Sequence, residues 1–333
     1  DIIKKGDIME ENLNIENIEV KEELRIVFMG TPDFARCVLE GICSKYNVRA
    51  IVTQPDKEVG RKKEIKISPV KEYANDNLIL CLQPEHIKDA TDEIISLKPN
   101  MIITCAYGQI LPRELLVMPK YGCINVHASL LPLLRGGAPI QRSIMEGHKK
   151  TGITIMHMSP YMDEGDIIVE KEIPILDDDN YTSLNNKLSI VGRDLLLEVI
   201  PQLYDGIAPR KEQDSTLATY APIIKKEDER IVFNKTTRQI VNQIRGLSDV
   251  PGAYCMFEGK RVKVFKAYAT EKSFNGCMNG EVTAIYKDGF GVKVENGEVV
   301  FTEIQMEGKQ RMNASSYING LQNKDKFIGR VFE

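Results

Sequence analysis

Short apolar runs alternate with helical patterns along the first half of this 333-residue chain. The run Leu24–Met29 is apolar apart from Arg25, which is typical of a strand buried on both faces of a sheet. Gly30 ends this run, and Pro32 then opens a helix, where proline suits the first turn. Further apolar runs follow at 48–52, 101–105 and 124–126. This alternation predicts an α/β domain with a mostly parallel sheet that is covered by helices on both faces.

Composition divides the chain into four parts. Residues 1–23 are acidic and lack periodicity, so we expect a mobile leader there. Residues 24–204 hold the alternating strands and helices, ending in two strands and one long helix. Residues 205–228 mix Pro, Gly, Asp and Lys, and they predict a linker. Residues 229–333 combine one helical pattern with short strands and Gly/Asn turns, which predicts an OB-like β-barrel.

Overall composition argues against several classes of protein. No apolar run approaches the ~20 residues of a membrane helix, so we expect no membrane partner. The seven cysteines are scattered without a Cys-x-x-Cys pair, which predicts reduced thiols in a cytoplasmic protein and no zinc site. The formal net charge is −4, yet residues 225–333 carry 18 basic and 14 acidic side chains. This excess of positive charge favours a polyanionic partner for the C-terminal part.

Asn125 and His127 lie two residues apart at the end of an apolar run. Side chains alternate along a strand, so this spacing puts both on one face at the carboxyl end, where parallel sheets bind ligands. An amide donor beside an imidazole can stabilise a tetrahedral oxyanion and move a proton. Asp163, in a loop before Gly165, is a candidate to orient the imidazole, and Asp166 competes for that role.

Six segments form a specific pattern by their order and separation. They are Phe28–Phe34, Thr53–Asp56, Ala106–Pro112, Asn125–Pro132, Arg135–Gln141 and Thr151–Met156. Together they resemble the methionyl-tRNA formyltransferase family, and the resemblance extends from about Leu24 to the end of the chain. It implies a Rossmann-like catalytic domain that takes formyl from 10-formyltetrahydrofolate. It also implies an OB-like C-terminal domain that helps to hold initiator methionyl-tRNA, and we expect a monomer.

The resemblance also implies roles for individual residues. It places Asn125, His127 and Asp163 on the family's catalytic Asn, His and Asp. The family's folate-contacting loop falls on Ser129, Leu130, Leu131 and Pro132. The chemistry agrees, because attack of the methionine amine on the formyl carbon builds negative charge on the formyl oxygen, and the folate nitrogen must be protonated to leave. We expect no metal ion, since fixed dipoles of the protein can stabilise the negative charge on the formyl oxygen.

Two basic segments are candidates for contact with RNA. Residues 57–66 hold five basic and two acidic groups, and they predict a mobile loop. This loop resembles the family's tRNA-contacting insertion, with Arg61 as the principal candidate beside Lys62 and Lys63. In the C-terminal part, Arg261 and Lys263 would share one face of a strand, opposite Val262 and Val264. The same basic set includes Lys260, Lys266 and Arg245.

Other interpretations stay open at this point. A related formyltransferase that acts on glycinamide ribonucleotide or an amino sugar nucleotide shares the Asn-x-His, the Ser-Leu-Leu-Pro and a later Asp. The basic segment 57–66 and the C-terminal part favour tRNA instead. A Rossmann-type oxidoreductase needs a glycine fingerprint and an acidic residue after the second strand, whereas this chain has Thr53–Asp56 there. A non-catalytic RNA-binding protein has no use for Asn125, His127 and Asp163 together.

Overall fold

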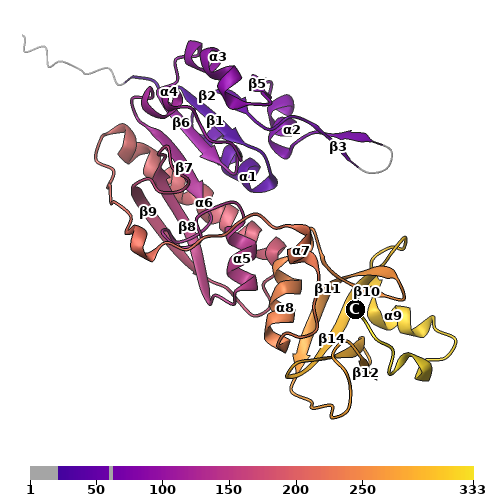
Figure 1. Cartoon of the computed structure of the whole chain (residues 1–333). Helices are drawn as coiled ribbons and strands as arrows, with labels where there is room; N and C mark the ends of the chain where they lie inside the picture. Colours follow the sequence, from indigo (N-terminus) through magenta and orange to yellow (C-terminus); the bar gives the residue numbers. More distant parts are fainter. Residues whose placement is uncertain (1–21, 60–62) are drawn as a thin grey trace, which may run out of the picture.

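The computed structural model describes residues 22–59 and 63–333 (Figure 1). Most of the expected leader lies outside the described residues, as do Arg61 and Lys62. Glu22 and Glu23 already contact the folded chain. The carboxylate of Glu22 pairs with Arg25 at 2.9 Å, and that of Glu23 accepts a hydrogen bond from Asn47 at 2.9 Å.

A seven-stranded sheet forms the centre of the N-terminal domain, with the order β5-β2-β1-β6-β7-β8-β9. Its strands are β1 (Ile26–Gly30), β2 (Val48–Val52), β5 (Cys81–Leu82), β6 (Met101–Cys105), β7 (Cys123–His127), β8 (Lys150–His157) and β9 (Ile167–Pro174). Neighbours from β5 to β7 pair in parallel, whereas β8 is antiparallel to both β7 and β9. The mostly parallel sheet that the sequence predicts is therefore confirmed.

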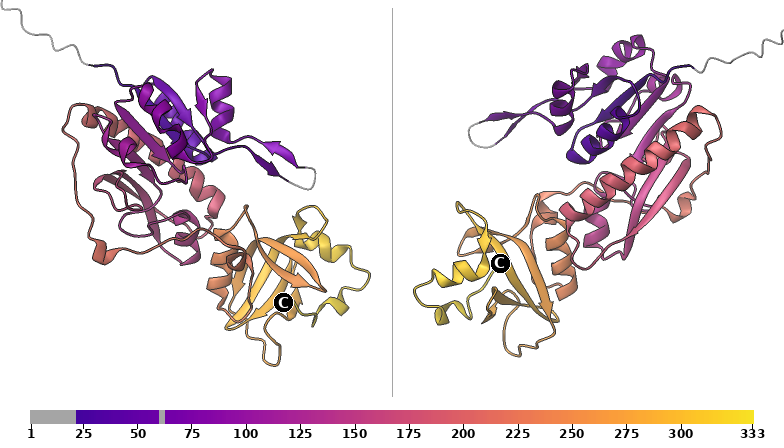
Figure 2. Two further views of the ribbon diagram at one scale, coloured as in Figure 1. Left: turned by 45° about the horizontal axis from the view of Figure 1, so that its top comes forward. Right: turned by 180° about the vertical axis from the view of Figure 1, so that it is seen from behind.

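Helices cover both faces of this sheet (Figure 2). They are α1 (Asp33–Cys43), α2 (Pro69–Asp76), α3 (Thr91–Ser96), α4 (Arg113–Val117), α5 (Pro139–Met145) and α6 (Tyr181–Tyr204). Ile26 and Phe28 of β1 share a core with α1 and α6, while Val27 and Met29 share one with α3 and α4. Burial on both sides explains why the β1 sequence is continuously apolar. Among the described helices, none has the length and apolarity needed to cross a membrane.

Helix α6 begins at a capping box, which fixes where the chain turns away from β9. The Asn180 side chain accepts a hydrogen bond from the Ser183 N–H at 2.8 Å. In return, the Ser183 hydroxyl accepts from the Asn180 N–H at 3.1 Å. These two bonds satisfy backbone donors that have no partner within the helix.

The basic segment 57–66, which we predicted to be a mobile loop, contains regular structure in its described residues. Its described residues form two antiparallel strands, β3 (Lys57–Val59) and β4 (Glu64–Lys66), with Glu58 opposite Ile65. The hairpin projects from the α/β domain, and all three residues of β4 are exposed. With no buried face, these strands carry no apolar alternation, so their sequence gives no periodic signal.

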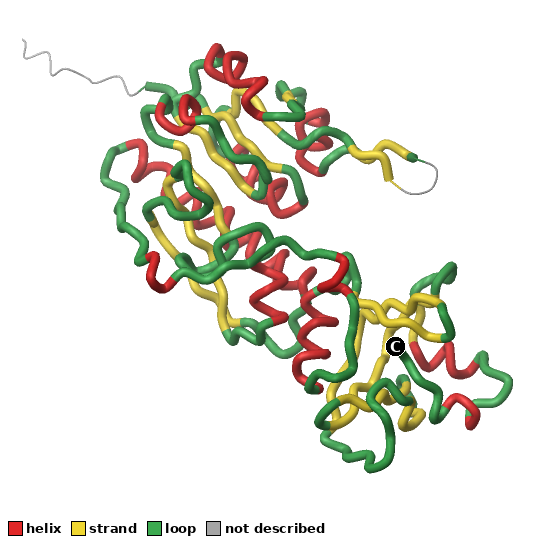
Figure 3. The backbone as a smooth tube through the Cα atoms, viewed as in Figure 1, coloured by secondary structure: helices red, strands yellow, loops and turns green. Residues whose placement is uncertain are grey.

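The segment expected as a linker packs closely against the α/β domain, and we call its residues 211–221 the strap. Figure 3 shows it as a tube that runs along this domain toward the C-terminal domain. Lys211 forms a β-bridge with Ile167, and Tyr220 forms one with Arg135. The strap contains the 3₁₀ turn η2 (Ser215–Leu217), and α7 (Lys226–Glu229) follows it.

The C-terminal domain is an antiparallel sheet with the order β10-β11-β14-β13-β12, and β15 pairs with β14. Its elements are α8 (Thr237–Gly246), β10 (Ala253–Phe257), β11 (Lys260–Thr270), β12 (Val282–Ile285), β13 (Phe290–Val294), β14 (Gly297–Met306), β15 (Met312–Asn313), α9 (Ala314–Asn319) and η3 (Asp325–Phe327). Rings of Phe257, Phe290 and Phe332 stack in its core. The antiparallel strands agree with the sequence analysis, while closure into an OB-like barrel stays a prediction.

Arg245 on α8 does not belong to a basic surface, contrary to our expectation. Arg245 is buried, with 9% of its surface exposed. Its guanidinium donates to the carbonyl oxygens of Leu176 at 2.9 Å and Asp179 at 3.0 Å, and to the Asn242 side chain at 3.1 Å. Arg245 therefore ties the C-terminal domain to the turn before α6. Charge counts cannot show this, because they do not distinguish a buried cation from an exposed one.

This contact predicts that Arg245→Met lowers the free energy of unfolding by about 2–4 kcal/mol, since carbonyl groups lose a charged donor in a buried place. Arg238→Met is the matched control on the same helix, because the Arg238 side chain is about half exposed and, among the described residues, pairs with the exposed Asp177. Urea unfolding of both variants checks the prediction. Equal stability of the two variants, with loss of RNA affinity in Arg245→Met alone, would contradict it.

Candidate active site

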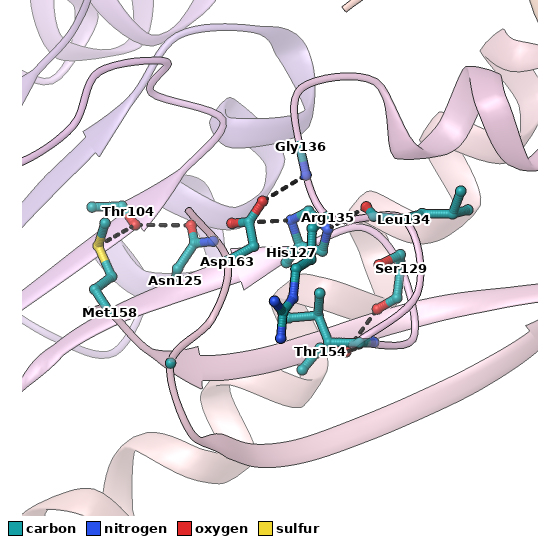
Figure 4. Close-up of polar contacts among 12 residues, drawn as sticks. Thr104, Asn125, His127, Ser129, Leu134, Arg135, Gly136, Thr154, Met158 and Asp163 are labelled. Carbon is teal, nitrogen blue, oxygen red and sulfur yellow. Dashed lines mark hydrogen bonds and ion pairs between the residues drawn. The ribbon is translucent and has the colours of Figure 1, made fainter. Parts of the chain in front are cut away.

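Asn125 and His127 lie on one face at the carboxyl end of β7, as their spacing predicts (Figure 4). They line a cavity of about 580 Å³ together with Asp163. Asp163 comes from the loop between β8 and β9, and its Oδ1 lies 3.6 Å from Nδ1 of His127. The structure therefore brings together three side chains that we had predicted to act as a group.

Both ring nitrogens of His127 have defined surroundings. Nε2 lies 3.1 Å from the carbonyl oxygen of Leu134. A carbonyl oxygen can only accept a hydrogen bond, so this contact holds a proton on Nε2. Nδ1 is then the nitrogen that can gain or lose a proton, and it faces the Asp163 carboxylate. His127 is 6% exposed, which keeps bulk water from competing for these contacts.

A backbone N–H holds the Asp163 carboxylate in place. Its Oδ2 accepts a hydrogen bond from the Gly136 N–H at 2.8 Å, and its own backbone is left-handed with φ +54°. The turn that follows needs a glycine, because a Cβ on Gly165 would lie 1.7 Å from the carbonyl oxygen of His157. Asp166, the competing candidate, is instead bound by Arg210 at 2.5 Å.

The Asn125 amide is oriented by a residue that the sequence analysis missed. The Thr104 hydroxyl on β6 donates to Oδ1 of Asn125 at 2.8 Å (Figure 4). Among the described residues, the Asn125 NH₂ group has no hydrogen-bond partner, so it is available to a ligand in the cavity. Thr104 is a polar residue in the otherwise apolar run 101–105, and it pairs directly with Asn125. A polar residue inside an apolar run was the sequence signal that could have identified Thr104.

The loop predicted to contact folate connects His127 with Leu134. Its shape is set by two hydroxyls: the Ser129 hydroxyl donates to the Leu133 carbonyl at 2.6 Å, and the Thr154 hydroxyl donates to the Ser129 carbonyl at 2.7 Å. Leu131 is buried. Ser129, Leu130, Leu131 and Pro132 do not themselves line the 580 Å³ cavity. Their role in folate binding stays a prediction.

Of the residues predicted to bind RNA, Lys63, Arg261 and Lys263 are described by the structure, and none of them lines this cavity. Lys63, near the tip of the β3–β4 hairpin, pairs with Glu58 at 3.3 Å. On β11, Val262 and Val264 are buried and Arg261 is exposed, which confirms the expected alternation. The Arg261 guanidinium stacks on the Tyr254 ring, 4.3 Å from its centroid. Lys263 is half-buried, and its ammonium donates to the Pro251 carbonyl at 2.6 Å.

Over residues 22–59 and 63–333, no group of three or more His, Cys, Asp or Glu side chains has the geometry to hold a metal ion. The cysteines are all unpaired, and Cys105, Cys123 and Cys255 are buried. Burial raises the pKa of the Cys123 thiol to about 12.

Proteins of known name match this chain over most of its length. Methionyl-tRNA formyltransferase of Bacillus licheniformis is 46% identical over 300 residues, which are 89% of this chain and 95% of the relative. The protein of the same name from Dictyoglomus turgidum is 46% identical over 315 residues, 93% of this chain and 99% of the relative. That of Bacillus subtilis is 46% identical over 302 residues, 89% and 94% of the two chains.

Solved structures share the fold at lower identity. HypX from Aquifex aeolicus, in complex with tetrahydrofolic acid, has a TM-score of 0.62 at 19% identity, over 90% of this chain and 47% of that one. The sugar 3N-formyl transferase WlaRD has a TM-score of 0.60 at 19% identity, over 87% of this chain and 100% of that one. At such identities the likeness shows the fold alone.

Two family models cover both domains of the chain. One described as formyl transferase matches residues 24–200. One described as formyl transferase, C-terminal domain, matches residues 223–322. With relatives of 46% identity over about nine-tenths of the chain, these matches show that it belongs to the methionyl-tRNA formyltransferase family.

Proposed function

We propose that this protein transfers the formyl group of 10-formyltetrahydrofolate to the α-amino group of methionine on initiator methionyl-tRNA. The observation that carries this conclusion is the convergence of Asn125, His127 and Asp163 on one cavity, in a chain of this family. The cavity of about 580 Å³ falls in the usual range for small-molecule sites, roughly 300–1,000 Å³. The relatives' name favours tRNA over glycinamide ribonucleotide or an amino sugar nucleotide as the acceptor.

Bound 10-formyltetrahydrofolate supplies an activated formyl group on nitrogen. The Asn125 amide fits the developing oxyanion, because its NH₂ group points to the cavity while Thr104 holds its oxygen. A donor fixed in this way before the reaction stabilises the negative charge without reorganisation. As the methionine nitrogen bonds to the formyl carbon, the π electrons of the formyl carbonyl move to its oxygen. The Asn125 amide would donate a hydrogen bond to this oxygen.

His127 handles the accompanying proton through Nδ1. The attacking amine gives up a proton, and the departing folate nitrogen takes one as the carbon–nitrogen bond breaks. Since Leu134 keeps Nε2 protonated, Nδ1 serves as the exchanging atom. The Asp163 carboxylate, 3.6 Å away, orients the ring and stabilises its positive form. We assign the folate contacts to Ser129, Leu130, Leu131 and Pro132, which continue directly from β7.

For tRNA we propose contacts on the hairpin and on β11. The hairpin and the C-terminal domain project toward the same side of the α/β domain in both views of Figure 2. A long polyanion can span both. Arg61, Lys62 and Lys63 would act on the hairpin, and Arg261 and Lys263 on β11. We also propose a monomer that works in the cytoplasm of a bacterial-type cell or in an organelle.

Incubation with initiator methionyl-tRNA and a donor labelled in its formyl group tests the proposed reaction. We expect labelled N-formylmethionyl-tRNA. Glycinamide ribonucleotide and an amino sugar nucleotide, offered under the same conditions, should stay unlabelled. Label on either of these acceptors, with none on the tRNA, would refute the assignment of the acceptor.

Asn125→Ala and His127→Ala should each lower turnover by at least ~10², because one removes the oxyanion donor and the other the proton carrier. Affinity for tRNA should change little, since both side chains act at the reacting carbon. Single-turnover kinetics and tRNA titration measure the two effects. His148→Gln is the control, because His148 pairs with Glu146 and does not line the cavity. Unchanged turnover in both alanine variants would remove these residues from the chemistry.

Arg261→Gln should weaken tRNA binding and reduce the slope of log affinity against log salt by about one, as expected for the loss of one phosphate contact. Lys263→Gln is the matched comparison, because its ammonium is already bound by the Pro251 carbonyl. Its effect on the slope should be smaller. A slope that Arg261→Gln leaves unchanged would argue against RNA contact on this face of β11.

A further inference from the structure

The guanidinium of Arg135 is a buried cation. Arg135 is 1% exposed, one of the largest fully buried side chains in the described chain. Its guanidinium donates to Oε1 of Gln213 at 2.8 and 3.2 Å and to the Ser215 hydroxyl at 3.2 Å. It also pairs with the Glu164 carboxylate at 3.2 Å. A buried guanidinium needs such partners, because an unpaired buried charge is strongly unfavourable.

Gln213 of the strap connects this cation to the backbone around Asp163. It is 7% exposed. Its Nε2 donates to the carbonyl oxygen of Asp163 at 2.8 Å and to that of Gly165 at 2.7 Å. Arg135 binds the amide oxygen, so the amide NH₂ group must face the two carbonyls. The side chain therefore clamps the turn that carries Asp163 in its left-handed conformation.

The strap also holds the opposite wall of the site. The Thr219 hydroxyl accepts from the Leu134 N–H at 2.8 Å. The Thr219 carbonyl accepts from the Arg135 N–H at 2.9 Å, and the Ala221 N–H donates to the Arg135 carbonyl at 2.7 Å. Leu134 is the residue whose carbonyl binds Nε2 of His127. The two groups that contact the His127 ring are the Leu134 carbonyl and the Asp163 carboxylate. Both belong to segments that are hydrogen-bonded to the strap.

We propose that Gln213 is a positioning residue for formyl transfer, acting through Asp163. This inference rests on the proposed function. Gln213 does not line the cavity, so its effect must pass through the backbone of residues 163–165. If this clamp is lost, the Asp163 carboxylate no longer stays beside Nδ1 of His127, and the imidazole loses the group that orients it. Displacement by about 1 Å in such an arrangement can cost on the order of 10² in rate.

Gln213→Glu is the sharpest test, because it preserves shape and the acceptor for Arg135. It replaces the Nε2 donor by an oxygen that faces two carbonyl oxygens, and the negative charge that it adds is paired with the Arg135 guanidinium. We expect turnover with initiator methionyl-tRNA to fall at least about tenfold. KM for the tRNA should stay within about twofold, since the side chain touches no substrate. Ser215→Ala is the control, because it removes another partner of Arg135 without reaching residues 163–165, and its turnover should match the wild type.

A double-mutant cycle separates positioning from general support of the fold. In an Asp163→Ala background, Gln213→Glu should change single-turnover rate by less than about twofold, because the group it positions is already absent. A tenfold loss in both backgrounds would overturn the proposal and assign Gln213 to folding alone. If Gln213→Glu does not fold, as judged by circular dichroism, Gln213→Asn replaces it, since the shorter side chain cannot reach both carbonyls. Formylation by the wild-type protein is measured first. A failure of the proposed function then shows in the wild type, whereas a failure of the proposed role of Gln213 shows only in the variants.

Discussion

Strand β7 pairs in parallel with β6 and antiparallel with β8, and these two ladders fix its register from both sides. Thr104 lies opposite Asn125 in one ladder, and Thr154 lies opposite His127 in the other. A slip of one residue would turn Asn125 and His127 to the other face, because side chains alternate along a strand. The reacting groups thus take their position from the interior of a seven-stranded sheet rather than from a flexible loop.

Around β7, a partner fixes one polar atom of each reacting side chain and leaves another for the reaction. The Leu134 carbonyl accepts from His127 and leaves Nδ1 for proton transfer. The Thr104 hydroxyl donates to Asn125 and leaves its NH₂ group for the substrate. The strap then secures both walls of the cavity before the chain enters the C-terminal domain. A site prepared in this way meets the charge of the transition state with dipoles already in place.

Elements with one or two buried faces were predictable from local patterns. The apolar runs at 48–52 and 101–105 became β2 and β6 with unchanged bounds. The hairpin β3–β4 was missed because its described side chains face solvent, so they show no apolar period. Arg245 was assigned to the wrong environment for a related reason, since composition records its charge but not its burial.

From sequence alone came the spacing of Asn125 and His127, the alternation that builds the sheet and the motifs that resemble the family. The partners of those two residues depended on the tertiary structure. Thr104 stands 21 positions from Asn125, and Gln213 stands 50 positions from the carbonyl of Asp163 that it binds. Only strand order and the path of the strap bring such residues together, because no local periodicity encodes which distant segments become neighbours. The family resemblance favoured Asp163 over Asp166, and the tertiary structure adds the geometry: Asp163 faces His127, whereas Asp166 is bound by Arg210.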